Sequence, residues 1–384
     1  MSFPDDIVIE ILSWLPVKPL MRFKCASKTW LRLISTDARF INLHNNRSLI
    51  SPDQNPSLFF SRAVIGFYYA EDYTACNEAV RIEIPFSYNF RFVNICHGLV
   101  CVYAGNRDKI CVWNPLTKDH ITIPCPPIPS QFDLDDPCGL TDIMFGFGFC
   151  EDRNEYKVVR LVSTATFEHY NEFHSLVSVY TLGSGSWRNL EEDVMQYNMS
   201  IISPSTAFVS GALHWYASKP FASHRYAHEI LVSFNLRDET FQEIPQPDGI
   251  KYPYPYKTVV GELGGCLSIF CKLQDEYIEI WLMKEYGVTD SWTKQAMFGK
   301  SEVHGSIIYL TPIGFANNGQ IITKKNRTEI ILYDPKTNSV RDLNKFDSDV
   351  HHIYTYTPTL VSPTIIDGVT LGAVEEENQN ESNR

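Results

Sequence analysis

The sequence predicts an α+β multidomain protein, with a short N-terminal three-helix unit followed by a mostly-β, propeller-like domain. Apolar residues recur at helical spacing only within residues 5–40. Aromatic residues make up 13% of the 384-residue chain, beside 20 Gly and 22 Pro, which favours short strands joined by turns. Aromatic strand motifs then recur with a period near 50, which is typical of propeller blades.

Three short helices are predicted at the N-terminus. Asp5 or Asp6 can cap the start of the first helix, and Pro16 ends it. Pro19 suits the first position of a second helix, and Trp30 belongs to a third.

Composition predicts the domain boundaries. We expect the helical unit in residues 1–44, a polar linker with two prolines in 45–57, the β domain in 58–366, and a disordered acidic tail in 367–384.

Five strand motifs carry the repeat in the β domain, and each centres on an aromatic residue: Trp113, Tyr180, Phe234, Trp281 and Tyr333. In three of them a partner follows seven residues later, which fits two strand ends joined by a tight turn. These partners are Trp187, Phe241 and Val340; Trp292 is the predicted partner of Trp281. Residues 58–90 are a candidate for a further blade, and a large irregular β-sandwich is the alternative fold.

Small residues precede most of these motifs, as in His97-Gly98, Ser210-Gly211, Gly264-Gly265 and Asn318-Gly319. We expect glycine there to allow close backbone approach near a propeller axis.

The charge distribution is uneven. The net charge is −12, whereas residues 1–42 hold six basic and four acidic groups, which leaves −14 for the rest. This balance argues against a nucleic-acid binder and fits a partner with positive charge.

The ten cysteines are scattered and lack a CxxC pair, which indicates free thiols in a reducing compartment. The N-terminus does not resemble a signal peptide, and no apolar run approaches the roughly 18 residues of a membrane span. We therefore expect a cytoplasmic or nuclear protein without a membrane partner.

Enzyme signatures are incomplete. Gly299-Lys300-Ser301 lacks the upstream glycine of a phosphate-binding loop, and His224 and His228 lack a third metal ligand. His97 and His214 lie in small-residue strands and are predicted to be structural. We expect no catalytic residue, no cofactor and no metal.

The N-terminal helices present more apolar surface than about 40 residues can bury, which calls for a protein partner. Pro-x-Asp at residues 4–6, Glu-Ile-Leu at 10–12, Leu-Pro-Val-Lys at 15–18, Arg-Phe-x-Cys at 22–25 and Ser-Lys-x-Trp at 27–30 together resemble the F-box motif. Phe3 and Trp14 depart from the usual leucine and basic residue. A cap on the β domain is the structural alternative.

The resemblance implies docking on a Skp-type adaptor, which joins a cullin and a RING subunit. The positions that would face the adaptor are Pro4, Ile7, Ile11, Leu15, Pro16, Leu20, Phe23 and Trp30.

The rest of the chain resembles the F-box-associated interaction domain of plant F-box proteins, whose propeller is kelch-like. The resemblance rests on His-Gly-Leu-Val-Cys at 97–101, Trp-Asn-Pro at 113–115, Gly-Ala-Leu-His-Trp at 211–215 and Ile-Trp-Leu-Met at 280–283. Within that group the chain resembles S-locus F-box and S-locus F-box-like proteins. This implies a substrate receptor of an SCF ubiquitin ligase, with a basic S-ribonuclease as target in self-incompatibility.

Two loops are candidates for target contact. One carries the acidic residues Asp133, Asp135 and Asp136, and the other carries Tyr252, Tyr254 and Tyr256, whose rings suit interface anchors. The alternative functions are a non-degradative F-box scaffold, a glycan-binding module and a propeller enzyme.

Overall fold

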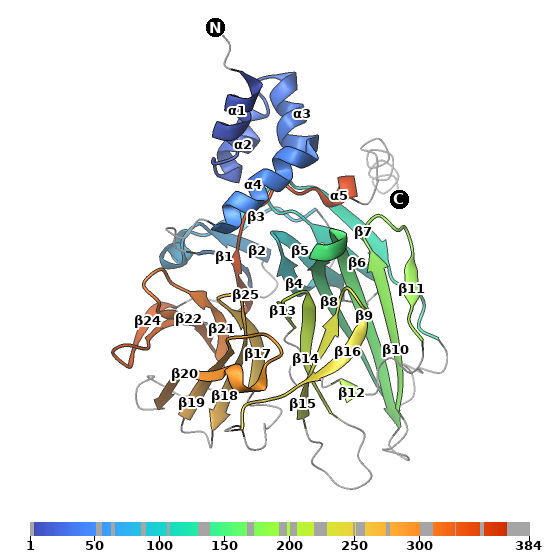
Figure 1. Cartoon of the computed structure of the whole chain (residues 1–384), viewed down its shortest axis with the longest axis vertical. Helices are drawn as coiled ribbons and strands as arrows, with labels where there is room; N and C mark the ends of the chain where they lie inside the picture. Colours follow the sequence, from blue (N-terminus) through green and yellow to red (C-terminus); the bar gives the residue numbers. More distant parts are fainter. Residues whose placement is uncertain are drawn as a thin grey trace.

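A computed structural model shows a six-bladed propeller with a helical module at one end (Figure 1). The structure describes residues 4–50, 56–62, 66–85, 90–105, 108–129, 139–166, 173–191, 198–199, 206–218, 229–248, 250, 258–273, 277–299, 310–326, 328–345 and 349–366. The predicted acidic tail at 367–384 lies outside these residues. No helix of the described ranges is long and apolar enough to span a bilayer.

The helical module (residues 4–50) contains α1 (Asp5–Leu12), α2 (Val17–Phe23), α3 (Lys28–Thr36) and a fourth helix, α4 (Ala38–Ile50). The placement of Pro19 at the first position of α2 was wrong, because the helix begins at Val17 after Pro16. Proline is tolerated at the third position as well, since the first four N–H groups of a helix have no intrahelical partner.

Helix α4 extends through residues 45–50, which we had predicted to be linker. Residues 45–48 are polar, and tertiary contacts of α4 hold this part of the chain in a helix. The ring of His44 donates from Nε2 to the carbonyl of Leu15 at 2.9 Å, and Arg47 pairs with Glu10. The linker prediction was therefore wrong for residues 45–50.

Each blade is an antiparallel sheet of four strands, and blade 4 has a fifth; the strands follow sequence order except in blade 1, where β25 comes first. Blade 1 contains β25 (Val350–Tyr356), β1 (Ser57–Arg62), β2 (Gly66–Ala70) and β3 (Val80–Ile82). Blade 2 contains β4 (Phe90–Cys96), β5 (Leu99–Ala104), β6 (Lys109–Trp113) and β7 (His120–Pro124). Blade 3 contains β8 (Gly139–Cys150), β9 (Glu155–Thr166), β10 (Phe173–Thr181) and β11 (Trp187–Asn189).

Blade 4 contains β12 (Asn198–Met199) and β13 (Ala207–Val209), which both pair with β14 (Ala212–Ser218), then β15 (Glu229–Asn235) and β16 (Thr240–Ile244). Blade 5 contains β17 (Thr258–Leu263), β18 (Cys266–Leu273), β19 (Tyr277–Met283) and β20 (Trp292–Gly299). Blade 6 contains β21 (Leu310–Phe315), β22 (Ile321–Lys325), β23 (Glu329–Asp334) and β24 (Ser339–Lys345). The short helices are η1 (Tyr73–Glu78), η2 (Glu151–Arg153), η4 (Thr289–Ser291) and α5 (Pro363–Ile366).

The two ends of the propeller chain close the ring in blade 1. Strand β25 pairs with β1, and Phe59 lies opposite Tyr354. This confirms the further blade predicted in residues 58–90, although its innermost strand comes from the C-terminal part of the chain. This pairing completes blade 1 with its first strand and ties the last part of the propeller chain to the first, while each blade keeps short edge strands.

The aromatic repeat marks the third strand of a blade. Trp113, Tyr180, Phe234, Trp281 and Tyr333 all lie in such strands. The seven-residue pairs are confirmed, because each partner lies directly opposite its aromatic residue: Trp187, Phe241 and Val340. The pairing of Trp281 with Trp292 was wrong, since a register shift places Lys294 opposite Trp281.

The small-residue segments are tight turns between the first and second strands of a blade. His97 and Gly98 have φ of 46° and 76°, and Ser210 and Gly211 have φ of 51° and 72°. Two successive positive φ values are typical of the type I′ hairpin turn, which favours glycine. The turn geometry thus accounts for glycine at these positions, and an added Cβ would be crowded at Gly98 and Gly264 but not at Gly211, Gly265 or Gly319.

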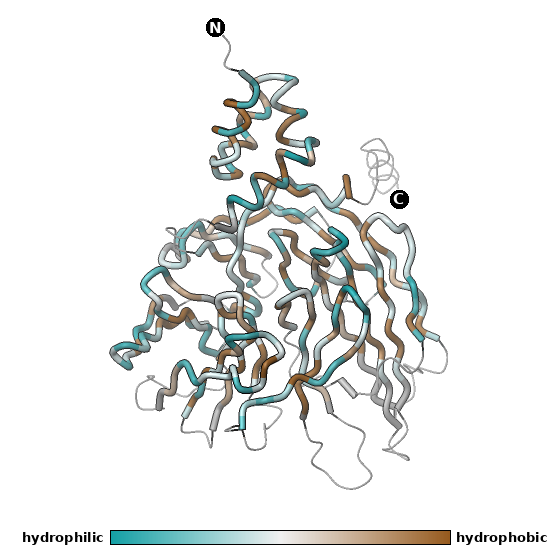
Figure 2. The backbone as a smooth tube through the Cα atoms, in the orientation of Figure 1, coloured by the Kyte–Doolittle hydropathy of each residue, from teal (hydrophilic) through white to brown (hydrophobic). Residues whose placement is uncertain are grey.

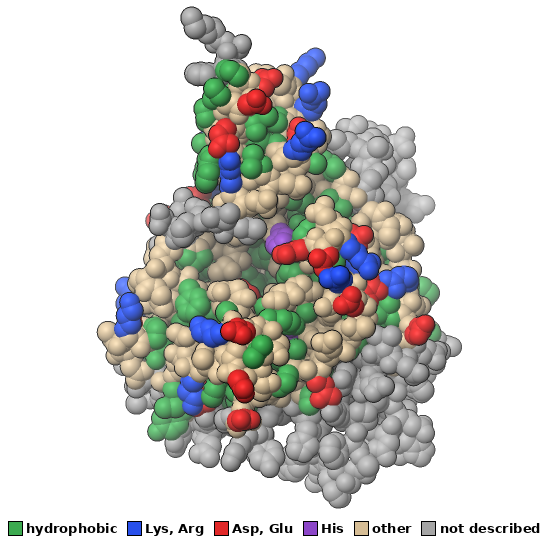
Figure 3. Space-filling model, viewed as in Figure 1, with side chains coloured by type: hydrophobic (Ala, Val, Ile, Leu, Met, Phe, Trp, Pro, Cys, Tyr) green, Lys and Arg blue, Asp and Glu red, His purple; other side chains and the backbone are tan. Residues whose placement is uncertain are grey.

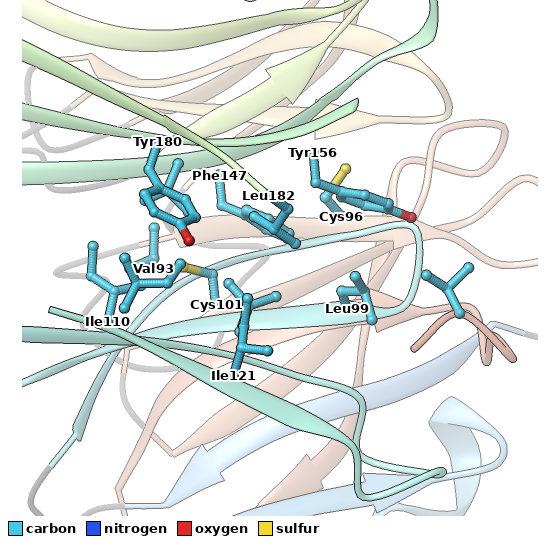
Figure 4. Packing of buried hydrophobic residues seen from close by; sticks show 14 of the residues in the cluster. Val93, Cys96, Leu99, Cys101, Ile110, Ile121, Phe147, Tyr156, Tyr180 and Leu182 are labelled. Carbon is cyan, nitrogen blue, oxygen red and sulfur yellow. The ribbon is translucent and has the colours of Figure 1, made fainter. Parts of the chain in front are cut away.

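Apolar side chains fill the spaces between neighbouring blades, and apolar positions follow the strands throughout the propeller (Figure 2). Figure 4 shows one such layer, in which Val93, Leu99 and Cys101 of blade 2 face Phe147 and Tyr180 of blade 3. The same cluster continues into the helical module through Leu12, Val17, Leu20, Ile34, Phe40 and Ile41. The module and blades 2 and 3 thus share one apolar cluster.

The propeller has two different ends. The helical module enters β1 and the chain leaves β25 at one end, where the first-to-second-strand turns also lie (Figure 1). Because the strands alternate in direction, each blade passes to the next at the opposite end. That opposite end receives the long connections after β7 (Pro124) and β16 (Ile244).

Candidate functional site

The helical module exposes a set of large apolar side chains. Five of the twelve exposed large apolar residues in the described part of the chain belong to it: Ile7, Ile11, Trp14, Phe23 and Leu31. Ile7 and Ile11 lie one turn apart on α1, so they share a face of the helix. Figure 3 shows apolar side chains on the surface of the module, which projects from the propeller.

The predicted contact residues do not all lie on this surface. Pro4 and Pro16, which precede α1 and α2, are exposed, as are Ile7, Ile11 and Phe23. Leu15 and Trp30 are half-buried, and the Trp30 ring makes an edge contact with Phe23 at a centroid distance of 5.8 Å.

The prediction that Leu20 faces the adaptor was wrong. Its side chain is 0% exposed and belongs to the core of the module with Leu12 and Val17. It packs the helices against one another and is not part of the exposed surface.

Trp14 and Leu31 were missed as members of the exposed surface. Trp14 is 63% exposed, and a signal for it was present, since it follows Ile7 and Ile11 at helical spacing. Leu31 carried no comparable sequence signal. Its neighbours on α3 include the exposed Lys28 and the half-buried Leu33, so they do not mark one apolar face.

A polar cluster holds α4 against α1 beside this surface. Arg47 donates to both carboxylate oxygens of Glu10 at 2.9 and 2.8 Å, and Trp14 donates from Nε1 to the same carboxylate at 3.2 Å. These bonds, chiefly the one from Arg47, lower the pKa of Glu10. The exposed surface therefore rests on helices with a fixed arrangement.

The predicted target-contact residues cannot be placed. Asp133, Asp135 and Asp136, and likewise Tyr252, Tyr254 and Tyr256, lie outside the described residues. The chain enters both segments from the end of the propeller away from the helical module, after β7 and β16.

The histidines that could suggest chemistry are engaged in packing. His214 is buried and contacts the carbonyl of Ala207 and the hydroxyl of Tyr286. The ring of His97 packs on the ring of Phe149, with 4.9 Å between the ring centroids. His224 and His228 lie outside the described residues, within which no group of three His, Cys, Asp or Glu side chains could hold a metal ion.

Sequence profiles of known families match nearly the whole chain. The F-box domain profile matches residues 1–42, and the profile of the F-box associated beta propeller domain matches residues 49–355. This chain belongs to the F-box proteins with an associated β-propeller domain. F-box domains bind Skp1 within SCF complexes, and proteins of this architecture are generally SCF substrate receptors.

Curated relatives of this F-box protein come from Arabidopsis thaliana. The F-box protein CPR1 is 26% identical over 358 residues, which cover 89% of this chain and 84% of that protein. The F-box/kelch-repeat protein At3g23880 is 25% identical over 385 residues, covering 94% and 96%. Among solved structures, YCF48 from Cyanidioschyzon merolae covers 77% of this chain and 88% of its own, with 9% identity and a TM-score of 0.40.

Proposed function

We propose that this F-box protein binds a target protein through its propeller and brings it to an SCF ligase for ubiquitination. The observation that carries the proposal is the exposed apolar surface of the F-box, which projects away from the propeller while its opposite side is joined to it. An exposed apolar surface of this kind suits a protein partner. The adaptor would contact Pro4, Ile7, Ile11, Leu15, Pro16, Phe23 and Trp30, with Trp14 and Leu31 in addition.

The mechanism is proximity. Binding holds lysines of the target near the conjugating enzyme that carries ubiquitin, and this raises the effective concentration of the lysines there. The F-box protein supplies no acid, base or nucleophile in this proposal. It would act in the cytosol or nucleus, and the free state of every cysteine among the described residues supports a reducing compartment.

We place target contact at the end of the propeller opposite the F-box. That end receives the connections that contain the acidic and tyrosine-rich segments, whereas the F-box end has two-residue turns such as His97-Gly98. The charge of −14 outside residues 1–42 would steer a basic protein. A secreted basic ribonuclease of the self-incompatibility type is the candidate that this charge and the S-locus resemblance favour.

Adaptor binding tests the first half of the proposal. We expect Ile11→Asp to abolish capture of a Skp-type adaptor by the full chain, since burying an unpaired carboxylate in an apolar interface is strongly unfavourable. Met297→Asp is the matched control, because Met297 is comparably exposed on β20 of the propeller. Equal capture by both variants, or none by the unaltered chain, would contradict the proposal.

The fate of a bound protein tests the second half. The half-life of a captured basic protein should lengthen when the proteasome is inhibited and when Ile11→Asp replaces the unaltered chain. A half-life that is insensitive to both changes would favour the non-degradative scaffold or the glycan-binding module instead.

A further inference from the structure

A segment beyond the propeller runs between the F-box and the blades. Residues 357–366, here called the strap, follow β25, pass beneath α4 and end in α5 beside β7 (Figure 1). The family profile of the propeller ends at residue 355, so the strap is not part of that match. Leu360 and Val361 are buried in the cluster that joins the F-box to blades 2 and 3.

One buried amide holds the strap to blade 2. Asn114 follows β6 and is 0% exposed. Its Nδ2 donates to the carbonyls of Thr359 at 3.0 Å and Val361 at 2.8 Å. Its Oδ1 accepts from the backbone N–H groups of Leu116 and Thr117, which forms the turn into β7.

The corresponding turns of other blades show which half of this amide the turn requires. In blade 4, Asn235 Oδ1 accepts from Arg237 and Asp238. In blade 6, Asp334 Oδ1 accepts from Lys336 and Thr337. Asp334 has no amide hydrogens, so the turn needs only the acceptor oxygen. The donor half of Asn114 therefore serves the strap.

A glycine in blade 2 lets the strap lie directly on a turn. A Cβ at Gly98 would lie 2.5 Å from the Thr357 carbonyl oxygen and 2.7 Å from Thr359 Cγ2. Gly211 holds the same turn position in blade 4 with nearly the same φ, and a Cβ there would meet nothing within 4 Å. The space at Gly98 is thus filled by the strap.

The strap also binds helix α4 of the helical module. Thr359 donates from its hydroxyl to Asn45 Oδ1 on α4 at 2.8 Å. The same residue therefore contacts Asn114 through its carbonyl and α4 through its side chain. Because both contacts are short and the intervening apolar residues are buried, movement of α4 relative to blade 2 would break them.

We propose that the strap is a positioning element, held by Asn114, that fixes the orientation of the F-box relative to the propeller. In the ligase, the strap would set the position of a bound target relative to the other subunits, and this role rests on the proposed function. The fixed orientation itself does not.

The orientation is measured on the full chain alone. Spin labels at Asn42→Cys on α4 and Asp290→Cys on blade 5, both exposed positions, report the distance between F-box and propeller in a Cys25→Ser background. We expect one narrow distance distribution for the unaltered strap. Asn114→Asp keeps the turn acceptor but loses the strap donors, so we expect the narrow distribution to be lost.

Two matched variants control for the turn itself. Asn235→Asp makes the same change in blade 4, and it should leave the distribution narrow. Gly98→Ala and Gly211→Ala share the strain of a positive φ, yet only the first displaces the strap, so only the first should broaden the distances. A narrow distribution in Asn114→Asp and Gly98→Ala, or equal broadening in the controls, would overturn the proposal.

The consequence for transfer is read in the reconstituted ligase, with the chain's own lysines as the probe acceptors. Asn114→Asp should change which lysines are modified while adaptor binding stays unchanged, and an unchanged pattern would overturn the positioning role. Absence of adaptor binding by the unaltered chain would instead contradict the proposed function and leave the distance measurements standing.

Discussion

The guanidinium carbon of Arg47 lies 4.5 Å from the centre of the Trp14 ring, so a side chain of α4 covers the aromatic residue that follows α1. Arg47 also pairs with Glu10 and reaches the backbone carbonyl of that residue at 3.2 Å. One side chain of α4 therefore fixes the end of α1, beside the exposed surface of the F-box.

Arg47→Ala should loosen this arrangement. We expect a loss of about 1 kcal/mol in the free energy of unfolding, the size of a partly exposed cation–π contact. Amide exchange in α4 should quicken as well. Denaturant titration and hydrogen exchange measure both effects. Arg39→Ala is the control, because Arg39 is exposed on the same helix; equal loss in both variants would contradict the role given to Arg47.

Leu20 and Ile11 should separate folding from binding. Leu20→Ala removes a fully buried side chain and should cost about 2–5 kcal/mol of stability. Ile11→Ala removes an exposed one, so we expect stability within about 0.5 kcal/mol of the unaltered chain. Adaptor affinity should nevertheless fall in Ile11→Ala. Calorimetric titration with a Skp-type adaptor measures the affinity, and thermal unfolding measures the stability. A large loss of stability in Ile11→Ala, or none in Leu20→Ala, would contradict the assignment of Leu20 to the core and Ile11 to the surface.

Local patterns were enough to predict the regular parts of the fold. Tyr180 and Trp187 lie seven residues apart because they end two strands of one hairpin, so their spacing is a property of neighbouring residues. Ile7 and Ile11 revealed their shared face for the same reason. Part of the F-box surface was thus accessible to sequence reasoning; Trp14 and Leu31 were missed, and the burial of Leu20 depends on packing against residues of the other helices.

Long-range contacts explain what the sequence did not reveal. The second half of helix α4 begins with the polar residues 45–48, and the helix is held by bonds from His44 to Leu15 and from Arg47 to Glu10. The innermost strand of blade 1 comes from β25, nearly three hundred residues after β1. The turn at His97 and Gly98 reads as a small-residue strand until its positive φ values are seen. Each feature depends on partners distant in sequence or on backbone geometry.

A buried ion pair joins blades 3 and 4. Lys157 Nζ donates to the Leu236 carbonyl at 2.7 Å and to Glu239 Oε1 at 2.9 Å, and Arg188 pairs with the same carboxylate. Lys157 is almost completely buried. Glu239→Gln should cost about 3 kcal/mol in the free energy of unfolding, because it leaves a buried ammonium without its counter-charge.

Arg188→Gln is the control for that pair. Its side chain is 58% exposed, so its contribution is screened by water and should be below about 1 kcal/mol. Denaturant unfolding of the two variants measures the difference. Equal losses would show that the exposed pair of Glu239 with Arg188 contributes as much as the buried pair with Lys157, which would contradict the prediction.

Protonation of His214 should destabilise the propeller at acid pH. Burial lowers the pKa of His214 to about 4, whereas an unfolded histidine titrates near 6.5. Its Nδ1 lies 3.2 Å from the Ala207 carbonyl, which can only accept, so the neutral ring accepts at Nε2 from the Tyr286 hydroxyl at 2.8 Å. A proton on Nε2 would abolish that acceptor.

The sign of the pH effect follows from the lowered pKa. As the pH falls, His214 of the unfolded chain takes up a proton before His214 of the folded chain does. The contribution of His214 to the free energy of unfolding is therefore constant above about pH 6.5, and it falls by about 1.4 kcal/mol per pH unit as the pH drops toward 4. His352, whose pKa burial lowers to about 3, adds to the same slope. Urea unfolding midpoints at neutral pH and near pH 5 measure it. His214→Gln should flatten the slope without removing it, and a slope unchanged by this substitution would show that His214 is not the titrating group.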